Sequence, residues 1–430
     1  MMLEIEVISK EIIKPSSPTP DHLRHYQLSF LDQISPPVYN PLALFYPVRG
    51  DDKLNQLEKS HQLKQSLSQV LTYYYPLAGR IKGNLFADCN DQGIPFFQAE
   101  VKCQLSDFID NPMPSELTKL IPFELDDAEE LPLGVQFNVF ECGGIVVGMG
   151  ISHKIGDALS VFTFIKTWAA TARGEADITL PEFISASLFP PLNISGFKPA
   201  TGITRDGAVV AKRFVFSASS IEALKEKYGR TASLQSQPPP SRIEVLSVFI
   251  WSRFMAATEA KPGHTRTYSM THAVNLRPRM DPPLPEYSFG NYYRVAFTVP
   301  SSIDSGDEDC CLLVSKVRDS ISKLDKDYVK RLQNGKEHLE FLKEQASSFM
   351  RGEMVSLNFT SLCRFPLYEA DFGWGKPKWA GSPKLTFKNL VIFMDTPFGN
   401  GVEALVHLQD EDMLKFLEDE QMLLFTTPVR

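Results

Sequence analysis

Ile145-Val146-Val147-Gly148-Met149-Gly150-Ile151-Ser152-His153-Lys154-Ile155-Gly156-Asp157 is the stretch that decides the fold. Its first seven residues are apolar or glycine and partly β-branched, which predicts a buried strand over 145–151. Beyond Asp157 the apolar residues recur at helical spacing, so an amphipathic helix follows, with a stripe made of Ala158, Val161, Phe162, Ile165, Trp168 and Ala169. His153 therefore stands between the end of a buried strand and the start of a helix.

The position of His153 suits acid–base chemistry. Strand ends that face a crevice often carry reactive groups, and an imidazole titrates at ~6.5, close to the pH at which a general base works best. Such a base takes the proton from a hydroxyl as its oxygen attacks a thioester carbonyl, and then protonates the departing thiolate. Gly156 has no Cβ, so it lets the chain turn sharply and lets a substrate approach the backbone.

Structural explanations stay open beside this catalytic one. A lone histidine at a strand end is more often a hydrogen-bonded core residue. Asp157 is equally well explained as the N-cap of the helix that starts at Ala158. The HxxxD pattern also arises by chance in many chains, so it does not assign a function by itself.

The 430 residues exceed what one core usually fills, which predicts two domains of similar size. Helical periodicity and strand patterns fade between about 185 and 212, where proline and glycine gather as in a surface linker. We predict an N-terminal domain over 1–195, a crossover linker over 196–212 and a C-terminal domain over 213–430.

Mixed α/β (α+β) architecture is expected in both domains. Leu63, Leu67, Val70, Leu71 and Tyr74 predict an early helix that Pro76 ends, and Ser241 and Glu244 have capping-box spacing ahead of a helix over 245–254. The remaining patterns predict strands at about 266–275, 291–299, 385–395 and 402–408, and helices at about 309–323, 337–350 and 410–423.

Composition excludes several classes of protein. The formal net charge of −8 disfavours a nucleic-acid partner, which requires a concentrated basic face. No stretch approaches the ~20 apolar residues of a membrane span, and the acidic start of the chain lacks a secretion signal. The six cysteines are scattered without metal-type spacing, so we expect no metal, reduced thiols and a cytoplasmic location.

Further motifs accompany His153. Tyr75-Pro76-Leu77-Ala78-Gly79-Arg80 precedes it; Asn275-Leu276-Arg277-Pro278-Arg279, Ser288-Phe289-Gly290-Asn291 and Asp371-Phe372-Gly373-Trp374-Gly375 follow it. In order and spacing, over essentially the whole chain, these motifs resemble the BAHD acyltransferases, a large and mainly plant family. HxxxD and DFGWG at this separation form a specific pair.

The resemblance implies two mixed-sheet domains of chloramphenicol-acetyltransferase-like type with a solvent channel between them. It implies His153 as general base in mid-channel, with direct transfer from acyl-CoA to an acceptor in a ternary complex and no permanently bound cofactor. It also implies that Asp157 is structural and pairs with an arginine. We expect Arg277 to be that partner, because a buried carboxylate needs a compensating charge.

The other motif residues are expected to support the site. The resemblance places the DFGWG element away from the histidine, with Gly373 and Gly375 forming a tight loop, Trp374 packing as an anchor and Asp371 structural. Ser241, Arg242 and Ser247 lie at a helix start that resembles the family's CoA side, and helix N-termini attract phosphate.

The finer resemblance is to members of the family that acetylate alkaloid or terpenoid alcohols, so acetyl-CoA and a small hydroxylated acceptor are the expected substrates of a monomeric enzyme. The sequence leaves open an N-acyltransferase acting on an amine, and a catalytically silent binding protein on the same fold. A Ser or Cys hydrolase is disfavoured, because no Gly-x-Ser-x-Gly elbow is present.

Overall fold

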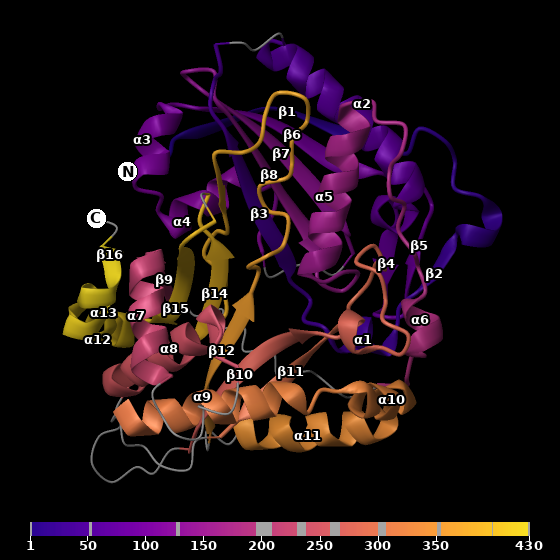
Figure 1. Ribbon diagram of the computed structural model, residues 1–430. Helices are drawn as coiled ribbons and strands as arrows, with labels where there is room; N and C mark the ends of the chain where they lie inside the picture. The colour runs from indigo at the N-terminus through magenta and orange to yellow at the C-terminus, as the bar shows by residue number, and fades with distance from the viewer. Residues whose placement is uncertain are drawn as a thin grey trace.

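The computed structural model describes residues 2–50, 54–125, 130–194, 209–229, 238–258, 267–299, 307–350, 354–397 and 399–428. Two mixed sheets dominate this part of the chain, one in each half (Figure 1). None of the helices in these ranges is both long and apolar enough to span a bilayer. The architecture is the α/β (α+β) class that the sequence predicts.

The first sheet has the strand order β1-β6-β7-β8-β3-β13, where the strands are β1 (Ile5–Ile13), β3 (Tyr39–Tyr46), β6 (Ile94–Val101), β7 (Leu133–Phe140), β8 (Ile145–Ser152) and β13 (Trp379–Gly381). A small sheet beside it is made of β2 (His25–Gln27), β5 (Phe86–Asp88) and β4 (Arg80–Lys82). The helices of this half are α1 (Phe30–Ile34), α2 (Gln56–Tyr73), α3 (Leu105–Asp110), α4 (Pro114–Leu117), α5 (Ala158–Ala172) and α6 (Ser185–Leu188).

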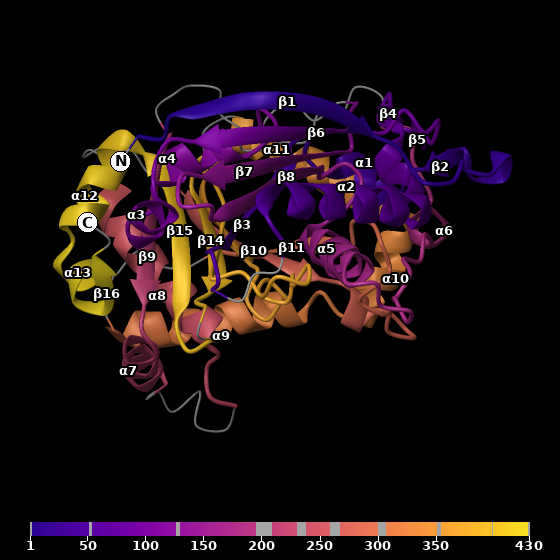
Figure 2. The same cartoon turned by 90° about the horizontal axis from the view of Figure 1, so that it is seen from above.

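The second sheet has the order β11-β10-β12-β14-β15-β9-β16, where the strands are β9 (Val209–Phe216), β10 (Thr267–Asn275), β11 (Tyr293–Thr298), β12 (Met354–Ser361), β14 (Leu390–Asp395), β15 (Val402–Gln409) and β16 (Thr426–Pro428). Its helices are α7 (Ala218–Tyr228), α8 (Arg242–Thr258), α9 (Asp307–Ser322), α10 (Lys326–Asn334), α11 (Lys336–Met350), α12 (Asp410–Glu418) and α13 (Glu420–Phe425). Seen from above, β1, β6, β7 and β8 of the first sheet run across the upper part of the view, and β9, β14 and β15 of the second sheet run across their direction (Figure 2).

Strand β8 is the centre of the first domain. It is buried along its whole length between β7 and β3, so its alternate residues must be apolar or very small on both faces. Helices α2 and α5 cover one face, where the Trp168 indole Nε1 donates to the carbonyl of Leu63 and to Ser66 Oγ at 3.3 and 3.0 Å. The predicted strand, helix α5 and helix α2 are therefore confirmed.

Other predicted elements differ at their ends. The capping box before α8 is present, with Ser241 N donating to Glu244 Oε2 and Glu244 N to Ser241 Oγ. The strand predicted over 385–395 begins only at Leu390. An unpredicted strand over 379–381 precedes it and pairs with β3 of the first sheet. The helix predicted over 410–423 is two helices, α12 and α13, since Asp419 ends the first and caps the second.

The predicted domain division needs two corrections. The linker predicted over 196–212 lies outside the described residues up to 208, but 209–212 belong to strand β9, where alternate residues are buried against β15. Strand β13, from the C-terminal half, completes the sheet of the N-terminal domain. The C-terminal half therefore supplies one strand to the sheet of the N-terminal domain, which the linear division over 1–195 and 213–430 does not include.

Gly148, in the middle of β8, provides a test of this packing. A Cβ at this position would lie 1.8 Å from the backbone oxygen of Leu120, so Gly148→Ala forces the strand and the 118–121 segment apart. We expect a loss of about 3 kcal/mol or more in the free energy of unfolding, at the upper end of overpacking costs, measured by denaturant unfolding.

Gly50→Ala is the matched control, because a Cβ there meets no atom of the described residues within 4 Å. Its free energy of unfolding should stay within about 0.5 kcal/mol of the parent. Equal unfolding midpoints for the two variants would contradict the close approach at Gly148.

Candidate active site

His153 lies in the turn that joins β8 to α5. Strand β8 pairs with β3 up to the pair Ser152–Tyr39, and the His153 amide then donates to the carbonyl of Val38 at 2.7 Å. Asp157 is the N-cap of α5, with Oδ1 accepting from the Ser160 amide at 3.0 Å. Both ends of the 153–157 turn are thus fixed by hydrogen bonds, and the imidazole projects from its first residue.

Asp157 also forms a buried ion pair with Arg277, the partner predicted from the sequence. Arg277 Nη1 lies 2.8 Å from Asp157 Oδ2, and Nη2 lies 3.1 Å from Oδ1. The Arg277 side chain is almost fully buried, and its guanidinium stacks over the Tyr292 ring. Burial alone would raise the pKa of Asp157, but the charge and hydrogen bonds of Arg277 outweigh it and hold the pKa below its usual range.

The same pair joins the two domains. Arg277 Nη2 and Nε donate to the carbonyl of Ser288 at 2.8 and 3.1 Å, and Asp157 Oδ2 accepts from the Tyr292 amide at 2.9 Å. The Asp157 amide donates in turn to the carbonyl of Gly290. The Ser-Phe-Gly-Asn segment of the C-terminal domain is therefore bound directly to the N-terminus of α5.

Asn291, at the end of that segment, sets the tautomer of His153. Its amide Nδ2 donates to the His153 carbonyl and to Asp32 Oδ1, both at 2.8 Å, which uses both amide hydrogens. Its Oδ1, 3.0 Å from His153 Nδ1, is therefore the acceptor, and Nδ1 carries the proton. The lone pair of the neutral ring is consequently on Nε2, as a base requires.

The surroundings keep the imidazole neutral. Burial lowers the pKa of His153 below its ordinary value, although the Asp157 carboxylate opposes this effect. Lys154, next in the chain, donates from Nζ to the carbonyls of Asp32, Gln33 and Ser35 at 3.2, 2.8 and 2.6 Å, and so caps the C-terminal end of α1. Burial lowers the pKa of Lys154 to about 8, with the Asp32 charge opposing.

No role for Asn291, Asp32 or Lys154 follows from local sequence patterns. Asn291 and Asp32 are 259 positions apart and meet only where the domains join. The sequence signal for Asn291 is the Ser-Phe-Gly-Asn motif itself, whose asparagine carries an amide able both to donate and to accept.

A cavity of about 1250 Å³ lies between the domains, and His153 is in its wall. Asp157 and Arg277 also line it, together with residues from α1, β3, α5, β10, β11, β12 and the loop before β14. Most of the wall is apolar, and its members include Ile34, Pro36, Val38, Leu42, Leu159, Phe162, Ala273, Val295, Phe297, Leu342, Leu362, Phe365, Leu385 and Phe387. The imidazole therefore faces a space large enough for two organic substrates.

The predicted CoA-side residues divide into two groups. Ser241 and Arg242 line the cavity at the start of α8, and Arg242 Nη2 pairs with Asp395 Oδ1 at 2.5 Å. Ser247 is fully buried within α8 and does not line the cavity, because it is one and a half turns further along the helix and faces the core.

Gly156 packs against the segment that carries Asn291. A Cβ at Gly156 would lie 3.1 Å from Ser160 Cβ and 3.3 Å from the ring of Phe289. The small residue makes room for Phe289, the aromatic anchor of the segment that carries Asn291.

The DFGWG element lies outside the cavity, as its expected structural role requires. Asp371 Oδ1 accepts from the amides of Gly373 and Gly375 at 2.8 and 2.9 Å, and both glycines have φ near +100°. Trp374 is buried in the N-terminal core, where it stacks on Tyr46, while Lys59 lies over its ring. The element therefore attaches the C-terminal half to the first domain.

The Asp157–Arg277 pair yields a stability prediction. Asp157→Ala leaves a buried guanidinium without its carboxylate and removes the cap of α5, so we expect the free energy of unfolding to fall by about 3–5 kcal/mol. Because the folded-state pKa of Asp157 is lowered, its contribution is complete above the ordinary pKa and is lost as pH falls through the folded value.

The measurement is denaturant unfolding from pH 7 down to pH 3 on the parent and on Asp157→Asn. The parent should lose more stability than the variant between about pH 4 and pH 3, because the amide does not titrate. Parallel curves for the two proteins would show that the pair contributes nothing to the acid sensitivity.

Comparison with known proteins agrees with this geometry. Residues 3–423 match the model of the Transferase family. Stemmadenine O-acetyltransferase of Catharanthus roseus is 39% identical over 99% of both chains, and vinorine synthase of Rauvolfia serpentina is 40% identical over 96% of both.

Solved structures give the same result. The crystal structure of vinorine synthase superposes with a TM-score of 0.84 at 37% identity, over 98% of both chains. TRI101 of F. sporotrichioides, crystallised with coenzyme A and T-2, shares the fold at a TM-score of 0.70 and 19% identity, over 94% of this chain and 100% of that one. The chain belongs to the Transferase family of BAHD acyl-CoA-dependent acyltransferases.

Proposed function

We propose that this enzyme transfers an acetyl group from acetyl-CoA to a hydroxyl of an alkaloid- or terpenoid-type alcohol, with His153 as the general base. The observation that carries the proposal is a neutral imidazole in the wall of a large interdomain cavity, with its Nδ1–H directed at Asn291 Oδ1 and its Nε2 left as the basic nitrogen. Relatives named stemmadenine O-acetyltransferase and limonoid 21-O-acetyltransferase support the acyl group and the acceptor class.

The reaction proceeds directly between two bound substrates. His153 Nε2 takes the proton of the acceptor hydroxyl as its oxygen attacks the thioester carbonyl, and the C–S bond then breaks. The imidazolium gives the proton to the thiolate, so free coenzyme A leaves and the base is regenerated. Asp157 takes no proton in this scheme. Its ion pair with Arg277 keeps the turn that carries His153 in place.

The apolar cavity wall supports a bulky, weakly polar acceptor. Phe162, Leu362 and Phe365 lie on one side of the cavity, between α5 and the end of β12. A rigid polycyclic alcohol buries apolar surface there at little conformational cost. Ser241 and Arg242, at the N-terminus of α8, are placed to interact with the CoA.

His153→Ala tests the base. We expect kcat to fall by roughly 10²–10⁴, as for loss of a general base, while the affinity for coenzyme A and the unfolding temperature stay close to the parent. Release of free thiol is followed with acetyl-CoA and a panel of polycyclic alcohols and amines. Ser247→Ala, outside the cavity, is the control and should retain its turnover.

An unchanged kcat in His153→Ala would refute the base. Acetylation of amines alone would refute the O-acyl assignment, and a parent enzyme that binds coenzyme A without releasing thiol would identify a silent binding protein.

The pH dependence gives a second test. Because burial lowers the pKa of His153, kcat/KM should rise with pH along an acid limb whose midpoint lies below the ordinary value of ~6.5, and should be level at pH 7. Initial rates between pH 5 and pH 8 with subsaturating substrates report this midpoint. A midpoint above the ordinary histidine value would show that the protein stabilises the imidazolium, and would contradict the tautomer argument.

A further inference from the structure

The interdomain cavity extends around the free edge of the second sheet. Strand β11 is the edge strand, and its residues Tyr293, Val295 and Phe297 alternate with Arg294 and Ala296. Arg294 pairs in register with Val274 of β10, so their two side chains lie on the same face of the sheet. This face is opposite to the one that carries Tyr293, Val295 and Phe297. Arg294 and Val274 nevertheless line the cavity, together with Ile34 and with Leu342 of α11. We call these four residues the β11 edge chamber.

Arg294 is buried in this chamber and has no partner among the residues that the structure describes. Only 8% of the residue is exposed, and Nε is sealed from solvent with no hydrogen-bond acceptor. Within the described ranges its guanidinium makes neither a hydrogen bond nor an ion pair. The other buried or half-buried arginines differ, since Arg277 pairs with Asp157, Arg213 pairs with Glu403, and Arg279 donates to two carbonyls.

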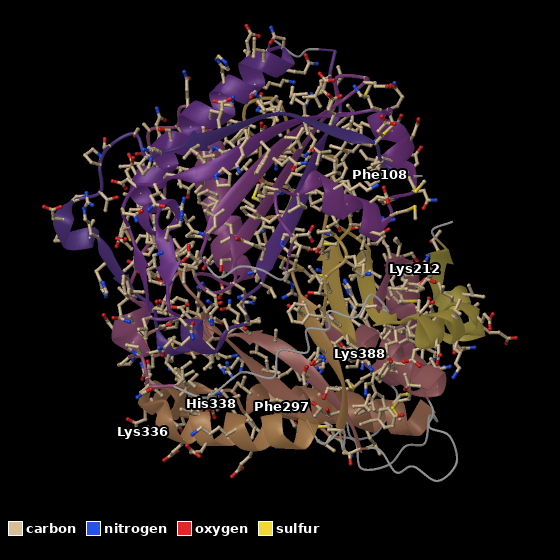
Figure 3. The ribbon with its side chains drawn as sticks, turned by 180° about the vertical axis from the view of Figure 1, so that it is seen from behind. Phe108, Lys212, Phe297, Lys336, His338 and Lys388 are labelled. Carbon is tan, nitrogen blue, oxygen red and sulfur yellow. The ribbon has the colours of Figure 1, made fainter. Side chains whose placement is uncertain are left out.

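None of the described neighbouring groups neutralises Arg294. The charge of Arg294 acts on His338 of α11, whose Nε2 is also buried and has no hydrogen-bond partner in the described part of the chain. Burial, and then the Arg294 charge, lower the pKa of His338 to about 3, so the imidazole is neutral and supplies no negative charge. Asp157 and Asp32, whose charges act on the adjacent Tyr293, are already bonded to Arg277 and to Asn291. Figure 3 shows His338 and Phe297 beside the long helices that close this side of the molecule.

A buried guanidinium with no carboxylate is costly, and proteins offset such a charge with a counter-ion. In this chain the counter-ion is absent from the described residues, while the group lines a cavity built for substrates. Guanidinium binds phosphate and carboxylate oxygens through charge-assisted hydrogen bonds. An anionic group of a bound substrate therefore provides the counter-ion that Arg294 lacks among the described residues.

We propose that Arg294 is an anion-binding residue of the β11 edge chamber, which recognises phosphate or carboxylate oxygens of a substrate held in the interdomain cavity. This assignment rests on the proposed function, because that function supplies the two sources of such oxygens. One source is a phosphate of the acyl-CoA, and the other is a carboxylate on the acceptor.

Binding measurements separate the two sources. Calorimetry compares coenzyme A, 3′-dephospho-coenzyme A and pantetheine on the parent and on Arg294→Leu. If the anion is a phosphate, Arg294→Leu weakens coenzyme A by about 10–100-fold, as for loss of a hydrogen bond to a charged group, and leaves pantetheine within about twofold. A loss equal for coenzyme A and its dephospho form identifies the pyrophosphate; a loss confined to coenzyme A identifies the 3′-phosphate.

The second arm compares cyclohexanecarboxylate with cyclohexanol by the rise in unfolding temperature at equal concentration. If the anion is a carboxylate, the parent prefers the acid, Arg294→Leu loses that preference, and coenzyme A affinity is unchanged. Arg294→Lys should recover part of the coenzyme A affinity in the first arm, or part of the preference for the acid in the second. It keeps the positive charge but loses the forked geometry of the guanidinium.

Arg331→Leu is the matched control, because it removes an exposed arginine of α10 that does not line the cavity. Ligand-free Arg294→Leu should unfold at the same or a higher temperature than the parent, since an uncompensated charge has left the interior. The assignment is overturned if Arg294→Leu keeps both the coenzyme A affinity of the parent and its preference for cyclohexanecarboxylate over cyclohexanol. It is also overturned if Arg331→Leu changes these two quantities as much as Arg294→Leu does. Binding needs no turnover, so an enzyme that binds through Arg294 yet transfers nothing would refute the proposed function alone.

Discussion

One buried ion pair organises the site. The Asp157 carboxylate caps α5, accepts from the backbone of the C-terminal domain and pairs with Arg277, whose guanidinium in turn binds the carbonyl of Ser288. Every donor of this network is matched by an acceptor, which is the condition under which buried charges are tolerated. The turn that holds His153 and the segment that holds Asn291 are therefore fixed relative to each other, although they belong to different domains.

The hydrogen bond between those two segments determines the state of the imidazole. Asn291 donates both amide hydrogens, one to Asp32 Oδ1 and one to the His153 carbonyl. Its oxygen therefore accepts the hydrogen bond from His153 Nδ1. A desolvated ring with a fixed tautomer is preorganised to accept a proton on the opposite nitrogen. In this arrangement a hydrogen bond to an amide, rather than to a carboxylate, fixes the tautomer of the imidazole.

Features with local causes were predictable from sequence. The apolar run before His153, the helix after Asp157 and the capping box at Ser241 depend on neighbours a few positions away, and all three are present. The Arg277 pairing was also predictable, because a buried carboxylate demands a cation and the motif resemblance supplied one. The bond of Asn291 to Asp32 and the packing of Gly156 against Phe289 were not, since these partners meet only through tertiary structure.

Strand β13 has a consequence for how the molecule is built. Residues 379–381 leave the C-terminal half, pair antiparallel with Phe45, Leu44 and Ala43, and then return to β14 of their own sheet. The N-terminal half thus lacks one strand of its own sheet. Expressed without residues 379–381 it would leave β3 as an unpaired edge, and a hinge that parted the two halves would have to break the pairing of β13 with β3.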